Sequence, residues 1–379
     1  MASVITLRHV LTQRKPLVPC RSTANKNTIG RLWPEFHDGV TIWNDFNLAN
    51  LNESYGHVLD FQVSEQMLAD LRPDQALAGV VINRDEDLYH LICSNNAVMQ
   101  PTLQFAKSHL RFHPGITLRH SYSAPDRSVL ASIPDGPQRL TVDHVISLDD
   151  FPAPNLVVGL GRSSLKWSGR RLANQLDNPQ QKLLWPLRQL ANLCRNAQTR
   201  YGYIQTDEEL VACCFCEDGG DWKASIMPIP WGRNGIDVLT TDLALWWLCM
   251  LGMSSRHNRA LVKDEDVVRI NRWDVVDLGG DRGWVRRHGY SGFEQPTDPP
   301  PNPDGTAPAS DNGAAPPNPD STASASGNLA DFAGGVDLGF DENDWLNTGP
   351  DAGIDMPEAV DANDTNLGNF DRLNFHPTQ

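Results

Sequence analysis

The chain has 379 residues, of which 40% are hydrophobic and 21% are charged, and its formal net charge is -15. That length is sufficient for one large domain or two smaller ones with buried cores. Residues 298–379 contain 15 acidic side chains and one basic side chain, so they carry -14 and leave -1 for residues 1–297. The acidity therefore belongs to the C-terminal tail and says little about the surface of the folded part.

Two other protein classes are excluded by simple patterns. The longest apolar run, 243–253, is too short to span a bilayer, so we predict no membrane partner. The seven cysteines are odd in number and scattered, which argues against a disulfide scaffold and for a reducing compartment. We therefore expect an intracellular protein of the nucleus or cytoplasm. The acid-free, basic start of the chain predicts a flexible basic arm over residues 1–34, and its composition also suits a mitochondrial transit peptide.

The C-terminal third divides into a linker and a tail. Residues 294–327 are rich in Pro, Ala and Ser and contain a short repeat, in which 300–310 matches 316–326 at nine of eleven positions. Such a composition predicts an extended linker. In the acidic tail, 328–379, large hydrophobic residues alternate with acids over 328–346. That pattern is typical of segments that fold on binding a protein partner, and a solubilising spacer is the alternative.

Residues 35–293 form the predicted body, with mixed helical and strand patterns. We expect a helix over 85–110 split by Pro101, and a second over 177–196 that is kinked or restarted at Pro186. Alternating or continuous apolar runs predict strands, and a helix that is apolar on all sides begins at Asp242. The expected strands are 140–148, 155–161, 200–205, 210–216 and 222–229, the last three as a meander.

The region 139–216 combines this order of elements with a set of short motifs. These are Val142-Asp143, Gly159-Leu160-Gly161-Arg162, Lys166-Trp167, Gln189 and Tyr201-Gly202. In this order and spacing the region resembles the restriction-endonuclease-like PD-(D/E)XK core of a group of uncharacterised fungal proteins. The resemblance implies an α+β fold with a mixed sheet flanked by helices. It places the family's catalytic positions at Asp143, Leu160, Arg162 and Gln189.

Two of these positions depart from the family pattern. The resemblance implies a metal-binding Glu where this chain has Leu160, and a Lys where it has Arg162. Leucine offers no oxygen ligand to a hard cation, and arginine stays protonated, so it cannot serve as a base. We therefore expect no metal and no cofactor. Mg²⁺ would enter only if Asp149 or Asp150 supplied a migrated carboxylate, which would make the protein an active Mg²⁺-dependent nuclease.

The same region carries a one-sided charge. Residues 162–200 contain eight basic residues and one acid, Asp177. Clusters of this kind bind phosphate backbones, so we predict binding of nucleic acid or another polyanion, with the acidic tail as a competitor. The predicted anion-binding residues are Arg162, Lys166, Arg170, Arg171, Lys182 and Arg188.

The remaining chemical motifs are weak. Cys213 and Cys216 form a lone CxxC within an apolar strand, which indicates structural thiols. The leading interpretation is a non-catalytic regulatory or adaptor protein on a degenerate nuclease-like fold, with a tail for recruitment or autoinhibition. The nuclease above is one alternative. An accessory protein of a fungal pathway, in secondary metabolism or host interaction, is the other.

Overall fold

The computed structural model describes residues 5–21, 27–37, 39–110, 118–122, 128–129, 141–148, 155–254, 256–280 and 283–300. These residues belong to one compact unit, Met1–Ala307. The linker from residue 301 onwards and the acidic tail, including its 328–346 segment, lie outside the described residues, as do Asp149 and Asp150.

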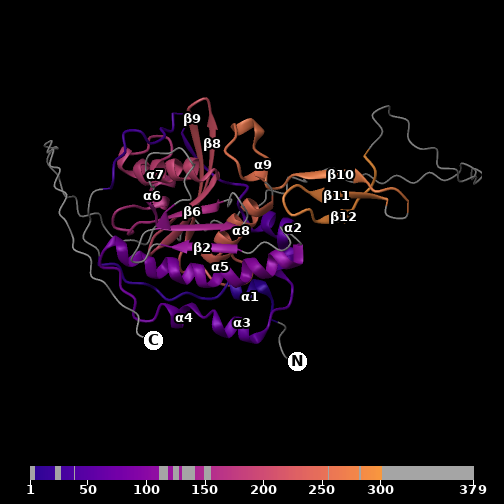
Figure 1. The fold of residues 1–379 in the computed structure, drawn as a ribbon, viewed down its shortest axis with the longest axis horizontal. Coiled ribbons are helices and arrows are strands. Elements are labelled where there is room, and N and C mark those ends of the chain that lie inside the picture. Colours follow the sequence, from indigo (N-terminus) through magenta and orange to yellow (C-terminus); the bar gives the residue numbers. More distant parts are fainter. Residues whose placement is uncertain are drawn as a thin grey trace, which may run out of the picture. The chain divides into compact units, whose positions relative to one another are not determined.

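A mixed sheet is the centre of the described fold, which is α+β as predicted (Figure 1). Its neighbouring strands are antiparallel except for the pairs β6–β7 and β1–β9, which are parallel. In spatial order the strands are β1 (Val40–Ile42), β9 (Asp221–Pro230), β8 (Glu209–Asp218), β7 (Tyr201–Gln205), β6 (Asn155–Gly161), β5 (His144–Leu148) and β2 (Leu118–Tyr122).

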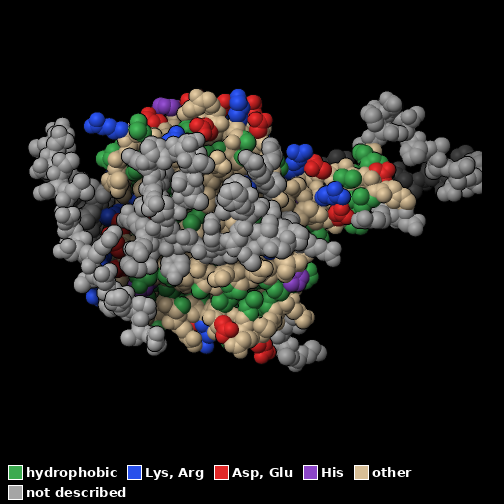
Figure 2. Space-filling view, viewed as in Figure 1, with side chains coloured by type: hydrophobic (Ala, Val, Ile, Leu, Met, Phe, Trp, Pro, Cys, Tyr) green, Lys and Arg blue, Asp and Glu red, His purple; other side chains and the backbone are tan. Residues whose placement is uncertain are grey.

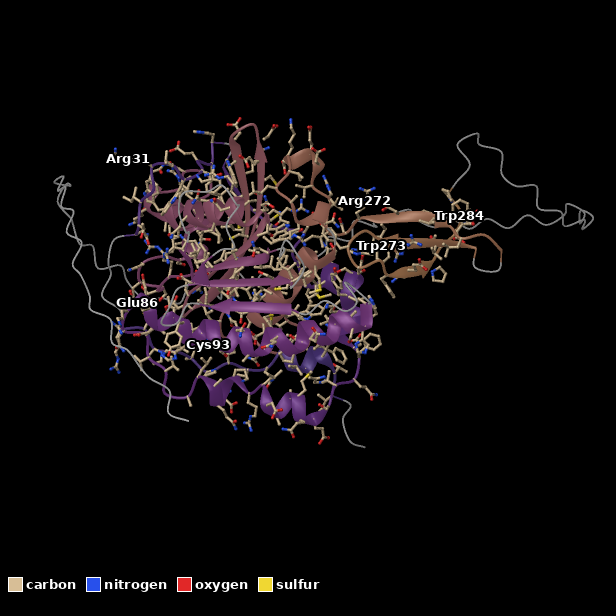
Figure 3. The ribbon with its side chains drawn as sticks, viewed as in Figure 1. Arg31, Glu86, Cys93, Arg272, Trp273 and Trp284 are labelled. Carbon is tan, nitrogen blue, oxygen red and sulfur yellow. The ribbon has the colours of Figure 1, made fainter. Side chains whose placement is uncertain are left out.

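Smaller pieces of sheet complete the strand content of the described residues. β3 (Ser128–Val129) pairs with β4 (Thr141–Val142). β10 (Trp273–Asp277), β11 (Trp284–His288) and β12 (Glu294–Pro296) form a three-stranded antiparallel sheet, whose two tryptophans mark opposite ends of the β10–β11 pair (Figure 3). Because β12 pairs with β11, the body extends beyond residue 293, and the expected start of the linker at 294 is wrong.

Helices cover both faces of the large sheet (Figure 1). On one face, α7 (Gln181–Ala197) and α6 (Gly169–Ala173) share an apolar cluster with strand residues such as Leu160 and Val211. On the other, α8 (Thr241–Ser254) is buried along nearly its whole length, as its all-round apolar sequence predicts. The other helices are α1 (Leu7–Leu11), α2 (Leu48–Leu59), α3 (Glu65–Asp70), α4 (Pro73–Ala76), η1 (Asp85–Leu88), α5 (Tyr89–Leu110), α9 (Arg256–Arg259) and η2 (Asp264–Asp266).

Both prolines predicted to interrupt helices lie inside continuous helices. α5 runs through Pro101, and α7 begins at residue 181 and runs through Pro186. Proline removes one helical hydrogen bond, which leaves the carbonyl four residues earlier without its donor. For Pro186 that carbonyl belongs to Lys182, and the side-chain amide of Asn27 donates to it at 3.2 Å. A partner distant in sequence thus replaces the missing donor, and the helix does not restart at Pro186.

The expected flexible arm over residues 1–34 is also wrong for the residues that the structure describes. Leu7 and Leu11 of α1 are fully buried in the main core. Beyond α1, the ammonium of Lys15 lies 2.6 Å from Asp242 at the start of α8, and both side chains are buried. The basic residues that suggested an arm therefore include one that is neutralised inside the fold.

Candidate functional site

The family-equivalent positions converge at the end of β6. Asp143 lies between β4 and β5, and its Oδ2 accepts a 2.9 Å hydrogen bond from the backbone N–H of Gly161. Arg162, the next residue, has its Nη1 3.7 Å from the same carboxylate oxygen. Its Nη2 donates to the side-chain oxygen of Gln189 on α7. Three of the four positions, Asp143, Arg162 and Gln189, are therefore brought together.

Leu160 does not take part in this cluster. Its side chain is 2% exposed and packs in the apolar layer between the sheet and α7. A carboxylate at this position would be buried among hydrocarbon side chains, at a cost that normally forces it to be neutral. At the position where the resemblance implies a glutamate, this chain therefore has a core leucine and no metal ligand.

A second carboxylate reaches the cluster from η1, a segment that no sequence motif linked to β6. Asp85 begins η1, which packs over the end of β6, since a Cβ on Gly161 would lie 3.2 Å from Leu88 Cβ. The Asp85 carboxylate accepts from the backbone N–H of Ser163 at 3.3 Å and pairs with the ammonium of Lys166. Figure 3 shows the neighbouring Glu86 close to the start of α5. We call Asp85, Asp143, Arg162, Lys166 and Gln189 the β6 polar cluster.

Acidic side chains also accept hydrogen bonds from the backbone of the loop that follows β6. Asp207 accepts from both the N–H and the hydroxyl of Ser164, at 2.8 and 2.7 Å. Glu209, which is 1% exposed, accepts from the N–H of Gly169 at 2.7 Å and from the Ser168 hydroxyl at 3.0 Å. Burial raises the pKa of the Glu209 carboxyl, against the opposing effect of Arg170 and these hydrogen bonds. The loop therefore holds carboxylates of its own chain where an anion-binding loop would hold a ligand.

Four of the six predicted anion-binding residues are paired with acidic side chains of the chain itself and do not form an open basic patch. Arg162 and Lys166 face the carboxylates described above, Arg170 lies 3.0 Å from Glu208 and 3.2 Å from Glu209, and Arg188 lies 2.8 Å from Glu35. Only Arg171 and Lys182 of the six are exposed. On the face in Figure 2, basic and acidic side chains are interspersed over the described part. The segment 162–200 has an excess of basic residues in sequence because the acidic partners of these residues come from other parts of the chain.

Gly159 of the Gly-Leu-Gly motif is required by packing. A Cβ on Gly159 would lie 2.4 Å from the ring of Tyr203 on the neighbouring strand, so only glycine fits there. The Tyr203 hydroxyl in turn hydrogen bonds to Nδ1 of His144 within the core.

Cys213 is buried as expected, whereas Cys216 is half-buried and lies within reach of Asp264. Within the described residues, no group of three or more His, Cys, Asp or Glu is arranged to hold a metal ion.

No protein-family model matches the chain, and neither a curated protein nor a solved structure has significant similarity to it. In the described residues no helix is long and apolar enough to cross a membrane.

Proposed function

We propose that this protein is a non-catalytic regulatory or adaptor protein whose core is a degenerate nuclease-like fold. One observation carries the proposal: the guanidinium of Arg162 bonds to Gln189 and faces Asp143, while Leu160 is part of the core. A permanent cation beside Asp143 supplies the counter-charge that a divalent metal would otherwise supply. The order β5, β6, α7, β7, β8 supports the nuclease-like core, because it is the order in which the sequence motifs occur.

A test of catalysis uses the full chain with plasmid DNA or single-stranded RNA and Mg²⁺ or Mn²⁺. We expect no cleavage, and no slowing of Mn²⁺ tumbling by electron paramagnetic resonance when the protein is added. Cleavage that is lost in Asp143→Ala and retained in Glu208→Ala, an exposed acid outside the cluster, would overturn the proposal.

The second candidate is the Mg²⁺-dependent nuclease, and the position of Asp85 favours it. Asp85 and Asp143 accept from backbone N–H groups two residues apart at the end of β6, with Lys166 beside Asp85. Two carboxylates and a lysine are the groups that such chemistry needs. In this case Asp85, rather than Asp149 or Asp150, is the migrated carboxylate, and Asp85→Ala would abolish cleavage as completely as Asp143→Ala.

The adaptor role rests on the acidic and aromatic segment 328–346. A fusion of residues 327–379 to a DNA-binding domain tests recruitment through a transcriptional reporter. We expect activation that is lost when Trp345 and Phe340 are replaced by alanine, because bulky hydrophobic residues carry most of the binding energy of such segments. A silent reporter would leave the tail as a spacer.

A further inference from the structure

A cleft of about 670 Å³ lies at the end of β7 opposite to the β6 polar cluster. Arg200 immediately precedes β7, whereas Gly161 and Arg162 lie beside Gln205 at the other end of that strand. The walls of the cleft come from the segment after β1, from β8, from the segment 263–270 and from Tyr290. We call it the Arg200 cleft. Its volume falls within the range of small-molecule sites.

Arg200 is an unusual residue to find in the lining of this cleft. Its side chain is 1% exposed, and Nη2 donates a 2.7 Å hydrogen bond to the Tyr290 hydroxyl. The guanidinium carbon lies 5.2 Å from the centre of the Tyr201 ring. The Nε–H has no hydrogen-bond partner, and no described carboxylate pairs with the guanidinium. A buried cation without a counter-ion is strongly unfavourable.

Two other buried basic side chains of the described residues lie beside carboxylates. Lys15 lies 2.6 Å from Asp242, and Arg188 lies 2.8 Å from Glu35. Arg200 has instead a phenol, an aromatic face and the thiol of Cys214 beside it. The free Nε–H and the lack of a carboxylate among the described residues together indicate that an anion from outside the described residues completes the site.

The surroundings restrict the kind of anion. Trp43 stacks on Tyr201 with ring centres 6.2 Å apart, and Val268 and Ile270 add apolar surface. At the rim, Lys223 pairs with Asp264, and Lys263 pairs with Asp218. Three further lining acids, Asp45, Asp221 and Glu265, outnumber the one further lining base, Arg269, and make the outer part of the cleft negative relative to its floor. One buried guanidinium under an acidic rim favours a single negative charge over a phosphate dianion.

We propose that the Arg200 cleft binds a small organic carboxylate, with the carboxylate on the Arg200 guanidinium and an apolar body against Trp43 and Tyr201. A planar carboxylate can accept from Nε–H and a terminal N–H of one guanidinium at once. The bound carboxylate supplies the counter-ion that the described residues do not provide. The proposal is independent of whether the β6 polar cluster cleaves nucleic acid.

The first test uses the unmodified full chain. Benzoate, 2-naphthoate and octanoate are each compared with the matching neutral amide, by titration calorimetry and by the rate at which N-ethylmaleimide alkylates Cys214 and Cys216 in the cleft. We expect at least one carboxylate to bind at least tenfold more tightly than its amide and to slow alkylation of this pair but not of Cys93, which lies on α5. Naphthyl phosphate is expected to bind more weakly than naphthoate. If no carboxylate exceeds its amide, the proposal is wrong, and if the phosphate binds best, the site is a phosphate site instead.

The second test uses variants. Arg200→Lys keeps the charge but loses the planar fork, and we expect carboxylate binding to weaken tenfold or more. Arg195→Lys, on α7 and outside the cleft, is the matched control and should bind as the unmodified chain does. Unchanged binding in Arg200→Lys would overturn the assignment. If Arg200→Lys does not fold, Trp43→Ala tests the apolar wall, and a loss of naphthoate affinity is then expected while the preference for carboxylate over amide remains.

Discussion

The ammonium of Lys15 and the carboxylate of Asp242 lie 2.6 Å apart inside the protein, 227 positions apart in the chain, with their side chains 3% and 2% exposed. The ammonium also donates to the hydroxyl of Thr241 at 2.9 Å and lies 4.1 Å from the centre of the Trp231 ring. This pair joins the N-terminal segment to the first turn of α8. It makes residues near the N-terminus part of the fold.

We expect Lys15→Met or Asp242→Ala to destabilise the protein by about 3–5 kcal/mol, because each leaves a buried charge without its partner. The double variant Lys15→Met, Asp242→Leu should recover most of the loss, since neither charge then remains. Urea unfolding of the parent protein, the two single variants and the double variant measures the free energy of unfolding of each. Arg14→Met, next to Lys15 but with an exposed side chain, is the control, and an equal loss in that variant would contradict the assignment.

Gly159 and Gly56 should respond in opposite directions to the same substitution. In Gly159→Ala the new methyl group would lie 2.4 Å from the Tyr203 ring, so we expect a loss of about 1–3 kcal/mol or more from overpacking. Gly56 lies inside α2, and its nearest neighbour to a new Cβ is 3.7 Å away. Gly56→Ala should therefore gain about 0.5–1 kcal/mol from helix propensity. Thermal unfolding compares the two, and a stabilised Gly159→Ala protein would disprove the packing argument.

The buried carboxylate of Glu209 fixes the loop that leads into α6. Glu209→Ala leaves the N–H of Gly169 and the hydroxyl of Ser168 without their acceptor, and we expect a loss of about 1–3 kcal/mol. Glu209→Gln keeps one oxygen as an acceptor and should lose less. Glu208→Ala, next to it but exposed, is the control and should change stability little, as exposed ion pairs contribute about 1 kcal/mol or less. Chemical denaturation provides the comparison, and equal losses at the two positions would refute it.

His288 should make the fold sensitive to mild acid. Its Nε2 bonds to the carbonyl of Ile270 at 2.7 Å, and its Nδ1 lies 3.3 Å from the N–H of Tyr290 and 3.2 Å from that of Ser291. The neutral ring suits this arrangement, because a proton on Nδ1 would face two donors. Burial lowers the pKa of His288, an effect only partly opposed by the Ile270 hydrogen bond and Glu53.

The sign of the pH effect follows from this lowered pKa. As the pH decreases, the unfolded chain binds the proton at a higher pH than the folded chain does. The free energy of unfolding should therefore fall as the pH decreases from about 6.5 towards the lower pKa of the folded state. His288→Gln removes this titration and should flatten that part of the stability curve, measured by urea unfolding between pH 7 and pH 5. His37→Gln, at an exposed position, is the control and should keep the slope of the parent protein.

Much of the sheet and its helical cover could be predicted from the sequence, because those elements depend on local patterns. The alternating and apolar runs correctly predicted β5, β6 and the meander β7–β9, and the all-round apolar run predicted the buried helix α8. The resemblance named Asp143, Arg162 and Gln189 as family-equivalent positions, and these three side chains lie together at the end of β6. The helices containing Pro101 and Pro186 were predicted less well, because what compensates a proline is a tertiary contact such as that of Asn27.

The electrostatics were decided only by the tertiary structure. In sequence, residues 162–200 have a strong positive excess, and Asp85, Glu35 and Glu208 are distant from them. In space these acids pair with Lys166, Arg188 and Arg170, since Coulomb energy depends on distance and dielectric and not on separation along the chain.

Composition by itself determined that the net charge of -15 belongs mainly to the tail, because counting charges needs no fold. Only the folded chain showed that most of the predicted anion-binding residues are neutralised and that Arg200, at the other end of β7, is not paired with a carboxylate of the described chain. Burial sets the cost of an unpaired charge, and burial is a property of the packed chain.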